Sequence, residues 1–375
     1  MTTTIEEVRS RRDLKEFVSF PFGLYKRNPY WVPPLRFDET NTLRKDRNPA
    51  FDCCDACYWL AYQNGTVVGR IAGIVNKKYN ELCGKRSARF GWVDFVDDEG
   101  VSRALFDQVE SWAVRQGLNE VHGPLGFTDM DREGMLVEGF DELGTLATIY
   151  NYPYYPRHIE KLGYKKDADW VEYEMVPPQE VPEKVRRLAL LVAERYHLTT
   201  MRFRKAKELL PYAREIFHLI NETYANLYGF VPLSERQIDH YVKQYFGFIR
   251  PEYVPLVLDR EGKVAAFGIT MPSMSRALQQ CRGRLFPFGF INLYRAMTHN
   301  DRVDLYLTAV RPDLQDKGVN AILMYETNVL YANRGIQRVE SNPELETNSK
   351  VRAQWRFYEG RQHKRRRCYL KHLPS

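Results

Sequence analysis

Apolar and polar positions in the second half of the chain predict a strand, a helix and another strand in succession. Residues 305–310 form an unbroken β-prone run, and a helical stretch follows that ends at the Asn-Arg-Gly of residues 333–335. Residues 336–340 then return to a β-prone pattern. Such a unit leaves unpaired backbone N–H groups at the positive end of its helix. The turn at residues 311–320 is therefore where this sequence would bind an anionic phosphate.

The first half of the chain predicts a similar series of elements. Residues 58–63 and 66–75 are β-rich and flank Asn64-Gly65, the strongest short signal for a hairpin. The other elements expected in this half are a helix at 13–25, an extended proline-rich segment at 28–34, a strand at 89–96, a helix at 101–116 and a strand at 120–123.

The two halves match in the order and spacing of these elements. Gly100 and Gly117 bound one helix and Gly318 and Gly335 bound the other, at the same separation of 17 residues. Each helix lies between two strands, and the second half has its own hairpin around Glu261-Gly262. Because this ordered match is difficult to obtain by chance, the sequence predicts an internal duplication of one mixed α/β domain.

A proline-rich connector separates the two copies. Residues 176–182 read Val-Pro-Pro-Gln-Glu-Val-Pro, which is typical of an extended linker. We therefore expect an N-terminal domain at residues 1–176, a linker at 177–182 and a C-terminal domain at 183–375. The second domain should contain helices at 183–196, 207–228 and 234–245 and a strand at 199–204. Its connection at residues 273–300 is long and rich in aromatic residues and arginine, and connections of that length are often functional.

Size and charge indicate a globular protein. The chain has 375 residues, of which 44% are apolar, so it can supply two cores. The net charge of +7 includes the run Lys364-Arg365-Arg366-Arg367. This excess is too modest to indicate nucleic acid, and an anionic cofactor or substrate accounts for it equally well. An ordinary surface with a slight basic bias accounts for it better than either. We expect the basic run on a terminal edge strand, where positive charge discourages pairing.

Cysteines and apolar windows indicate the compartment. Cys54-x-x-Cys57 has no second Cys or His pair that would complete a zinc site, so we expect a structural role and no metal. No window approaches 18 uncharged apolar residues, and the N-terminus lacks an apolar leader. We expect no membrane span and a location in the reducing cytoplasm.

Read between a strand and a helix, Gln315-x-x-Gly318-x-Asn320 resembles the acyl-CoA-binding motif of the GNAT acetyltransferase superfamily. That motif is Gln or Arg, two residues, Gly, one residue, then Gly or Ala, and Asn320 stands at its last position. The resemblance implies acetyl-CoA or another acyl-CoA as cofactor, with its diphosphate on backbone N–H groups. The residues implied are Gln315, Lys317, Gly318, Val319, Asn320 and Ala321, with backbone of Leu307 and Val310 beside the pantetheine arm.

The same resemblance suggests catalytic residues. In the superfamily a helix carries an Asn and, seven residues later, a Tyr that protonates the departing thiolate. Asn348 matches that Asn, but the seventh residue is Trp355, and Tyr358 lies about one helical turn further. We expect Tyr358 to be the acid and Glu340 the base. Glu222 is an alternative base, and either glutamate is equally a solvated carboxylate.

The resemblance is closer to an uncharacterised bacterial branch with two such domains in tandem. It is carried by residues 25–34, 121–127 with 134–140 and 150–155, and 283–289. The first copy has Asp97-Asp98-Glu99 where a phosphate would lie, so we expect it not to bind the cofactor. Its segments 123–144 and 150–155 either line an acceptor groove between the domains or pack in the core, and His122 is expected to be structural.

The sequence thus supports an α/β protein of two tandem GNAT-like domains, an acyl-CoA-dependent N-acyltransferase with its cofactor in the C-terminal domain. The acceptor would be a small-molecule or peptide amine of unknown identity. The alternative is a catalytically inactive protein that binds a metabolite or a partner in the same cleft. A further hypothesis is that Lys364–Arg367 contacts RNA or an aminoacyl-tRNA, as tandem relatives of this fold do.

Overall fold

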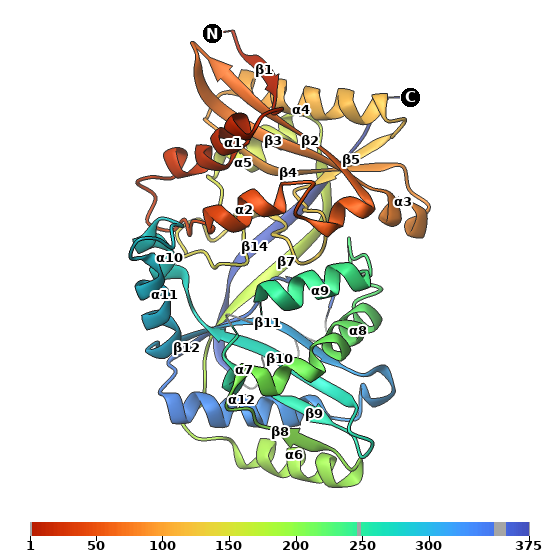
Figure 1. Ribbon diagram of the computed structural model, residues 1–375, viewed down its shortest axis with the longest axis vertical. Coiled ribbons are helices and arrows are strands. Elements are labelled where there is room, and N and C mark those ends of the chain that lie inside the picture. The colour runs from red at the N-terminus through yellow and green to blue at the C-terminus, as the bar shows by residue number, and fades with distance from the viewer. Residues whose placement is uncertain (1, 246–248, 349–357, 375) are drawn as a thin grey trace.

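The computed structural model describes residues 2–245, 249–348 and 358–374. A single mixed sheet runs along the molecule, with strand order β1-β2-β3-β4-β5-β14-β7-β12-β11-β10-β9-β8 (Figure 1). The first half contains β1 (Thr4–Glu7), α1 (Arg11–Leu24), α2 (Arg36–Thr42), β2 (Cys54–Gln63), β3 (Thr66–Asn76), α3 (Lys77–Cys83), β4 (Ser87–Phe95), α4 (Glu99–Arg115), β5 (Glu120–Gly123), β6 (Met135–Glu138), α5 (Tyr154–Lys161) and β7 (Lys165–Val176).

The second half begins with α6 (Glu183–Arg195). It continues with β8 (Thr199–Met201), α7 (Ala206–Leu209), α8 (Ala213–Thr223), α9 (Glu235–Tyr245), β9 (Leu256–Leu258), β10 (Val264–Pro272), α10 (Ser275–Cys281), α11 (Gly289–Thr298), β11 (Arg302–Val310), α12 (Asn320–Arg334), β12 (Arg338–Glu340), β13 (Glu344–Leu345) and β14 (Glu359–His372). None of the described helices is long and apolar enough to cross a bilayer.

The sheet topology shows the duplication that the sequence predicts. Read inward from its two edges, the sheet contains two equivalent sets of strands. One set is β1 to β5, and the other is β8 to β12. In the first copy β4 and β5 are parallel and pair at three positions, and in the second copy β11 and β12 do the same. Helices α4 and α12 follow β4 and β11, at opposite ends of the molecule (Figure 1).

Most of the predicted elements are confirmed. Asn64-Gly65 forms the hairpin turn, with Gln63 opposite Thr66. Helix α1 begins after Ser10, whose side chain accepts a hydrogen bond from the Asp13 backbone N–H. The helix expected at 207–228 is wrong in one respect, because it breaks into α7, a 3₁₀ turn at Leu210–Tyr212 and α8. Pro211 lies in that turn, and a proline cannot donate the helical hydrogen bond.

The last strand joins the two halves. β14 pairs with β5 and with β7, and β7 in turn pairs with β12. Residues assigned from the sequence to the second domain thus complete the sheet of the first, as the long central strands in Figure 1 show. The expectation that Lys364–Arg367 lies on an edge strand is therefore wrong. β14 has neighbours on both sides, and carboxylates of β7 neutralise the basic run.

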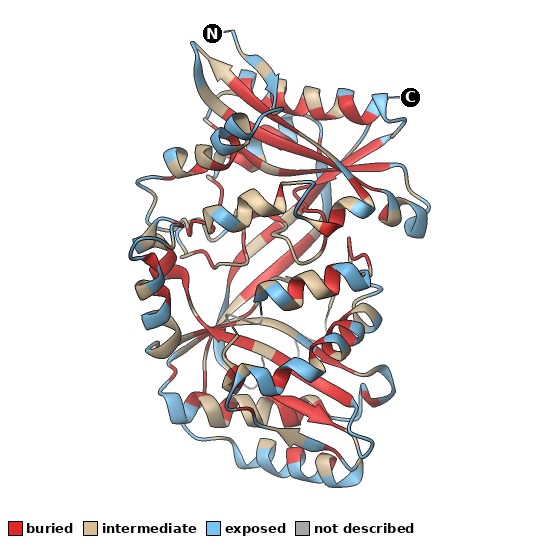
Figure 2. Ribbon diagram, in the orientation of Figure 1, coloured by how far each residue is buried: buried red, intermediate tan, exposed pale blue. Residues whose placement is uncertain are grey.

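Each copy has its own apolar core. In the first, one face of α4 packs over the sheet through residues such as Val101, Leu105 and Val109, and these side chains are fully buried. In the second, α6 and α12 pack together through Val192 and Ile322. Figure 2 shows buried residues concentrated on the strands, with exposed residues on the outer helix faces. The two cores hold the facing surfaces of the copies in fixed positions.

Candidate active site

A cavity of about 570 Å³ lies between the two copies. The second copy lines it with β10, β11, α12 and the segment after β12. The first copy lines it with residues 129–133 and 146–150 and with part of α2. A pocket of this size, enclosed by two domains, is typical of a small-molecule site.

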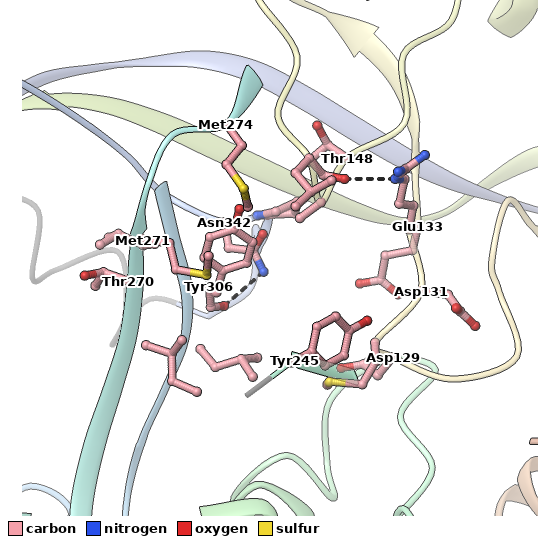
Figure 3. Close-up of a pocket in the computed structure, with 18 of the residues that line it drawn as sticks. Asp129, Asp131, Glu133, Thr148, Tyr245, Thr270, Met271, Met274, Tyr306 and Asn342 are labelled. Carbon is pink, nitrogen blue, oxygen red and sulfur yellow. Dashed lines mark hydrogen bonds between the residues drawn. The ribbon is translucent and has the colours of Figure 1, made fainter. Parts of the chain in front are cut away.

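The cavity reaches a place where two strands part. β11 and β12 pair from Arg302 to Asp304, and β11 then continues to Val310 with no strand partner on that side among the described residues. The Asn342 side chain lies in the opening and donates from Nδ2 to the Tyr306 carbonyl oxygen at 3.1 Å (Figure 3). Leu305 and Leu307 line the cavity here. Strands that part in this way leave backbone groups that can bind a ligand.

The first copy closes the equivalent opening. After β5, the Leu125 N–H donates to the Phe90 carbonyl oxygen of β4 at 2.9 Å. The chain passes so close that a Cβ on Gly123 would lie 2.2 Å from the same oxygen. The backbone of this copy thus occupies part of the gap between β4 and β5, although Trp92, Val93 and Pro124 still line the cavity.

The two copies also differ at the start of the helix that follows. In the first copy the Asp98 carboxylate caps α4 and accepts from Gly100 N at 2.7 Å and Val101 N at 3.3 Å. In the second, Val319 precedes α12, and in the described part of the chain no side chain caps the helix. A helix start without its own carboxylate keeps the attraction for an external anion.

The turn before α12 has a backbone that suits a close ligand. The Gln315 side chain donates to the Val310 carbonyl oxygen at 3.0 Å and ties the turn to β11. Gly318 has φ +81°, a conformation that favours glycine. A Cβ at Gly318 would lie 3.3 Å from the Val192 side chain of α6. The Lys317 ammonium lies over the Tyr196 ring, 5.4 Å from its centre.

One side of the cavity is strongly apolar. The side chains concerned come from β10, β11, α8, α10, α11 and α12, and they are Ile216, Phe217, Ile269, Met271, Met274, Leu278, Leu293, Leu305, Leu307, Leu323 and Met324. Figure 3 shows Met271 and Met274 on this side, next to Tyr306 and Asn342. Flexible methionine side chains adapt to apolar ligands of irregular shape.

The facing side carries acids from a loop of the first copy. Asp129, Asp131 and Glu133 lie there (Figure 3). Burial raises the pKa of Asp129 to about 6 and that of Asp131 to about 6, although the Arg89 charge opposes both shifts. Burial, with the Asp129 charge, raises the pKa of Glu133 well above its ordinary value. Such a cluster in a cavity attracts a cation and can accept a proton near neutral pH.

The Asp131 carboxylate and the neighbouring Arg132 guanidinium have defined surroundings. The Asp131 carboxylate accepts from Phe127 N at 2.8 Å and Thr128 N at 3.1 Å, which fixes the loop. The Arg132 guanidinium donates from Nε to the Leu146 carbonyl oxygen at 2.9 Å and lies 3.6 Å from Glu39. In the described chain, the polar contacts of Arg132 are thus with Leu146 and Glu39 and not with the three acids.

Four of the residues implied by the motif line the cavity, and they are Leu307, Asn320, Asn348 and Tyr358. The Tyr358 hydroxyl donates to Asn328 Oδ1 at 3.0 Å, and burial raises its pKa to about 12. Asn348 follows a turn after β13, and the residues after it, where the helix is expected, lie outside the described residues. Trp355, at the position where the superfamily has its Tyr, is outside the described residues.

The other predicted residues lie outside the cavity. Val310 ends β11, Glu340 ends β12, and the turn and the start of α12 contain Gln315, Lys317, Gly318, Val319 and Ala321. Glu340 is ion-paired with Lys364 and lies 3.4 Å from His363 Nε2. Burial opposes its ionisation, but these two partners hold its pKa down at about 2. Glu340 is thus a poor proton acceptor. Glu222 is exposed on α8 and does not line the cavity.

A buried charge network surrounds Lys364 in the shared sheet. Glu172 is fully buried and pairs with Arg366, and it lies 3.6 Å from Lys364. Glu172, Glu340 and His363 have their ligand atoms close enough together to hold a metal ion. Because the Lys364 ammonium already lies beside both glutamates, it supplies the positive charge that a metal would bring.

Histidine and cysteine side chains have structural surroundings. His122 is fully buried, stacks on Tyr79 and lies with Nδ1 3.1 Å from the Tyr228 hydroxyl, and burial lowers its pKa well below the usual value. Cys54 and Cys57 are free thiols on β2, and burial contributes to raising both pKa values.

Sequence reasoning missed the three acids as a group. It left segments 123–144 and 150–155 open between an acceptor groove and the core. The structure divides the latter, since Tyr150 lines the cavity and Tyr155 is fully buried in the first core. The available signal was the presence of three acids within five residues, Asp129, Asp131 and Glu133, in a segment that forms a turn.

Comparisons with known proteins place the chain among similar sequences and folds. No protein-family model matches it. It is 29% identical over 371 residues to protein YghO of Escherichia coli K12, covering 97% of this chain and 94% of that one. It is 25% identical over 290 residues to a bacterial ceramide synthase of Caulobacter vibrioides, covering 76% and 74%.

Two solved structures share the architecture. One is a tandem GNAT protein from the clavulanic acid biosynthesis pathway, with a TM-score of 0.57, 14% identity and 100% of both chains covered. The other is a GCN5-related N-acetyltransferase from Anabaena variabilis, with a TM-score of 0.53, 9% identity and 100% and 73% covered. These likenesses confirm the predicted fold of two tandem GNAT-like domains.

Proposed function

Given two tandem copies of the GNAT fold, we propose that this protein is an acyl-CoA-dependent N-acyltransferase whose second copy binds the cofactor. The observation that carries the proposal is the cavity, which joins the opened end of β11 and β12 to the acids of the first copy. A donor site and an acceptor site would thus face each other in one enclosed space.

We expect the second copy, and not the first, to bind the cofactor. In the second, the uncapped start of α12 and the open side of β11 provide backbone groups for a diphosphate and a pantetheine arm. Lys317, Gly318, Val319, Asn320 and Ala321 would hold the diphosphate, and Leu307 and Val310 the arm. In the first, the Asp98 carboxylate and the Leu125 backbone occupy the corresponding places.

When bound, the cofactor would supply the acyl group as a thioester. The chain would supply proton transfers, since an amine reacts with a thioester only in its neutral form. Asp129 and Asp131, with pKa values of about 6, are ionised at neutral pH and would attract an ammonium group and accept its proton. Tyr358 keeps its proton at neutral pH and would donate it to the leaving sulfur.

We propose a long-chain amine as the acceptor. Ceramides are N-acylated long-chain amino alcohols, and one relative is a ceramide synthase. The cavity matches that chemistry, because it has acids on one side for the ammonium group and a continuous apolar wall on the other for a chain. A short polar amine would leave that wall in contact with water.

The experiment is to incubate the purified protein with a fatty acyl-CoA and sphinganine and to follow thiol release and amide formation by mass spectrometry. Ethanolamine replaces sphinganine in the matched reaction. We expect amide formation with sphinganine, and kcat/KM at least 100-fold lower with ethanolamine. Equal rates with the two amines would contradict the long-chain acceptor, and no amide with any acyl-CoA and amine would contradict the enzyme.

The alternative is a protein that binds the same ligands without transferring an acyl group. The observation that favours it is Trp355, which stands where the superfamily has a proton-donating tyrosine. Acyl-CoA binding with no turnover, together with an amine that binds in competition, would support this alternative.

A further inference from the structure

The connection between β10 and β11 is a distinctive feature of the second copy. It spans residues 273–301 and forms α10 and α11, whereas the corresponding connection in the first copy spans only residues 77–86. It is fixed to the first copy, since Arg36 N donates to the Gly283 carbonyl oxygen at 3.0 Å and Gln279 Nε2 to the Pro29 carbonyl oxygen at 2.8 Å. Figure 1 shows both helices at one edge of the molecule. Its outer surface therefore has a defined shape.

That outer surface exposes large aromatic side chains. Phe286, Phe288, Phe290 and Tyr294 are 78%, 71%, 49% and 62% exposed. They are four of the twelve exposed large apolar side chains of the described chain, within nine consecutive residues. The rings of Phe286 and Phe290 lie 6.2 Å apart. Such a concentration of exposed apolar surface marks an interaction site.

The same segment is positively charged. Residues 273–300 contain Arg276, Arg282, Arg284 and Arg295 and no aspartate or glutamate. All four arginines are exposed, and in the described part of the chain none of them forms an ion pair with a carboxylate. We call Arg282, Arg284, Phe286, Phe288, Phe290, Tyr294 and Arg295 the aromatic-arginine face. Its charge complements an anionic surface.

The inner face of these helices belongs to the cavity. Met274, Leu278 and Leu293 are buried, pack together and line it. One pair of short helices thus has the cavity on one side and the aromatic-arginine face on the other. If another structure bound the aromatic-arginine face, an apolar molecule in that structure would be separated from the cavity by about the thickness of one helix.

We propose that the aromatic-arginine face binds the surface of an anionic lipid bilayer. Its arginines would contact lipid phosphates, and its phenylalanines would enter the boundary between headgroups and acyl chains. The assignment depends on the exposed side chains and not on catalysis, so it stands independently of the proposed reaction. An acidic protein would match the arginines. A bilayer also accounts for the exposed phenylalanines and for the apolar cavity behind them.

The test is sedimentation of the full-length protein with sucrose-loaded vesicles of phosphatidylcholine, alone or mixed with phosphatidylglycerol. We expect binding to the mixed vesicles that weakens with added salt and is weak on phosphatidylcholine alone. The Phe286→Ser/Phe288→Ser variant should bind at least tenfold more weakly. The Arg282→Gln/Arg284→Gln variant should lose about fivefold per arginine and part of the salt dependence.

The matched control is Leu190→Ser/Leu191→Ser on α6, where two exposed apolar side chains lie away from this face. Urea denaturation of each variant checks that it folds. The proposal is overturned if the wild-type protein does not sediment with the mixed vesicles, if the control loses binding instead, or if both face variants bind like wild type. A salt-sensitive complex with an acidic acyl carrier protein, in place of vesicle binding, would assign the face to a protein partner.

Discussion

Replacement of Asp129 by asparagine tests whether the buried, mutually repelling acids of the cavity destabilise the folded protein and so favour binding of a cation. Within the described chain the Asp129 carboxylate has no hydrogen-bond partner, and it lies near Asp131 and Glu133. The difference between a pKa of about 6 and the ordinary 3.8 corresponds to about 3 kcal/mol. This is an upper limit for the gain in stability, because the carboxylate is coupled to its neighbours.

The sign of the effect follows from the direction of the shift. The folded protein binds this proton more tightly than the unfolded chain, so wild-type stability falls as the pH rises from about 4 to about 6. Above that range the full free-energy penalty for ionising the buried carboxylate is present. The Asp129→Asn variant lacks it, and we expect about 1–3 kcal/mol more stability than wild type near pH 7.5 and no gain near pH 4.

The assay is urea denaturation at both pH values, with Asp107→Asn as the control for an exposed aspartate of α4. Sphinganine should stabilise the wild-type protein more than the Asp129→Asn variant, because its ammonium group relieves the repulsion among the acids. A variant that is less stable than wild type near pH 7.5, or equally stabilised at both pH values, would refute this reasoning.

Two further substitutions test the shared sheet and the proposed acid. Lys364→Met removes the ammonium between Glu172 and Glu340 and should cost about 3–5 kcal/mol in urea denaturation. The Lys364→Met/Glu340→Gln double variant should recover part of this loss, and a cost under about 1 kcal/mol would contradict the network. Tyr358→Phe should lower kcat by about 100-fold and stability by only about 1 kcal/mol, through the lost Asn328 hydrogen bond. Unchanged kcat would exclude Tyr358 as the acid.

Local patterns predicted the fold well because each depends on neighbouring residues. Asn64-Gly65 requires a tight turn, and the predicted hairpin forms there with Gln63 opposite Thr66. Gly335 ends α12 with φ +64°, as a helix-terminating glycine does. The equal spacing of the glycines in the two halves predicted the duplication without knowledge of any contact.

Strand partners could not be predicted from those patterns. A β-prone run shows that a strand exists but not which strand lies beside it, and β14 returns to the first copy across the whole sequence. Lys364 to Arg367 therefore looked like a surface run. Their buried partners Asp169 and Glu172 lie almost 200 residues earlier in the chain, too far apart for any local rule to connect.

The candidate site was predictable where it depends on one segment and not where it depends on two. The turn at Gln315 to Asn320 follows a motif of six residues. The acids at Asp129 to Glu133 become a site only because residues of the second copy such as Tyr245 enclose them (Figure 3). The sequence alone gives no sign of that enclosure.

The most direct test of the account is calorimetric titration of acetyl-CoA into the wild-type protein and into Gly318→Glu. The matched control is Gly262→Glu, which also replaces a glycine of positive φ, in a place with open space around it. We predict one site per chain, lost in Gly318→Glu and retained in Gly262→Glu, because a carboxylate before α12 repels the diphosphate. Absence of binding to the wild-type protein, or equal binding by all three proteins, would contradict the claim that the second copy holds the cofactor at this turn.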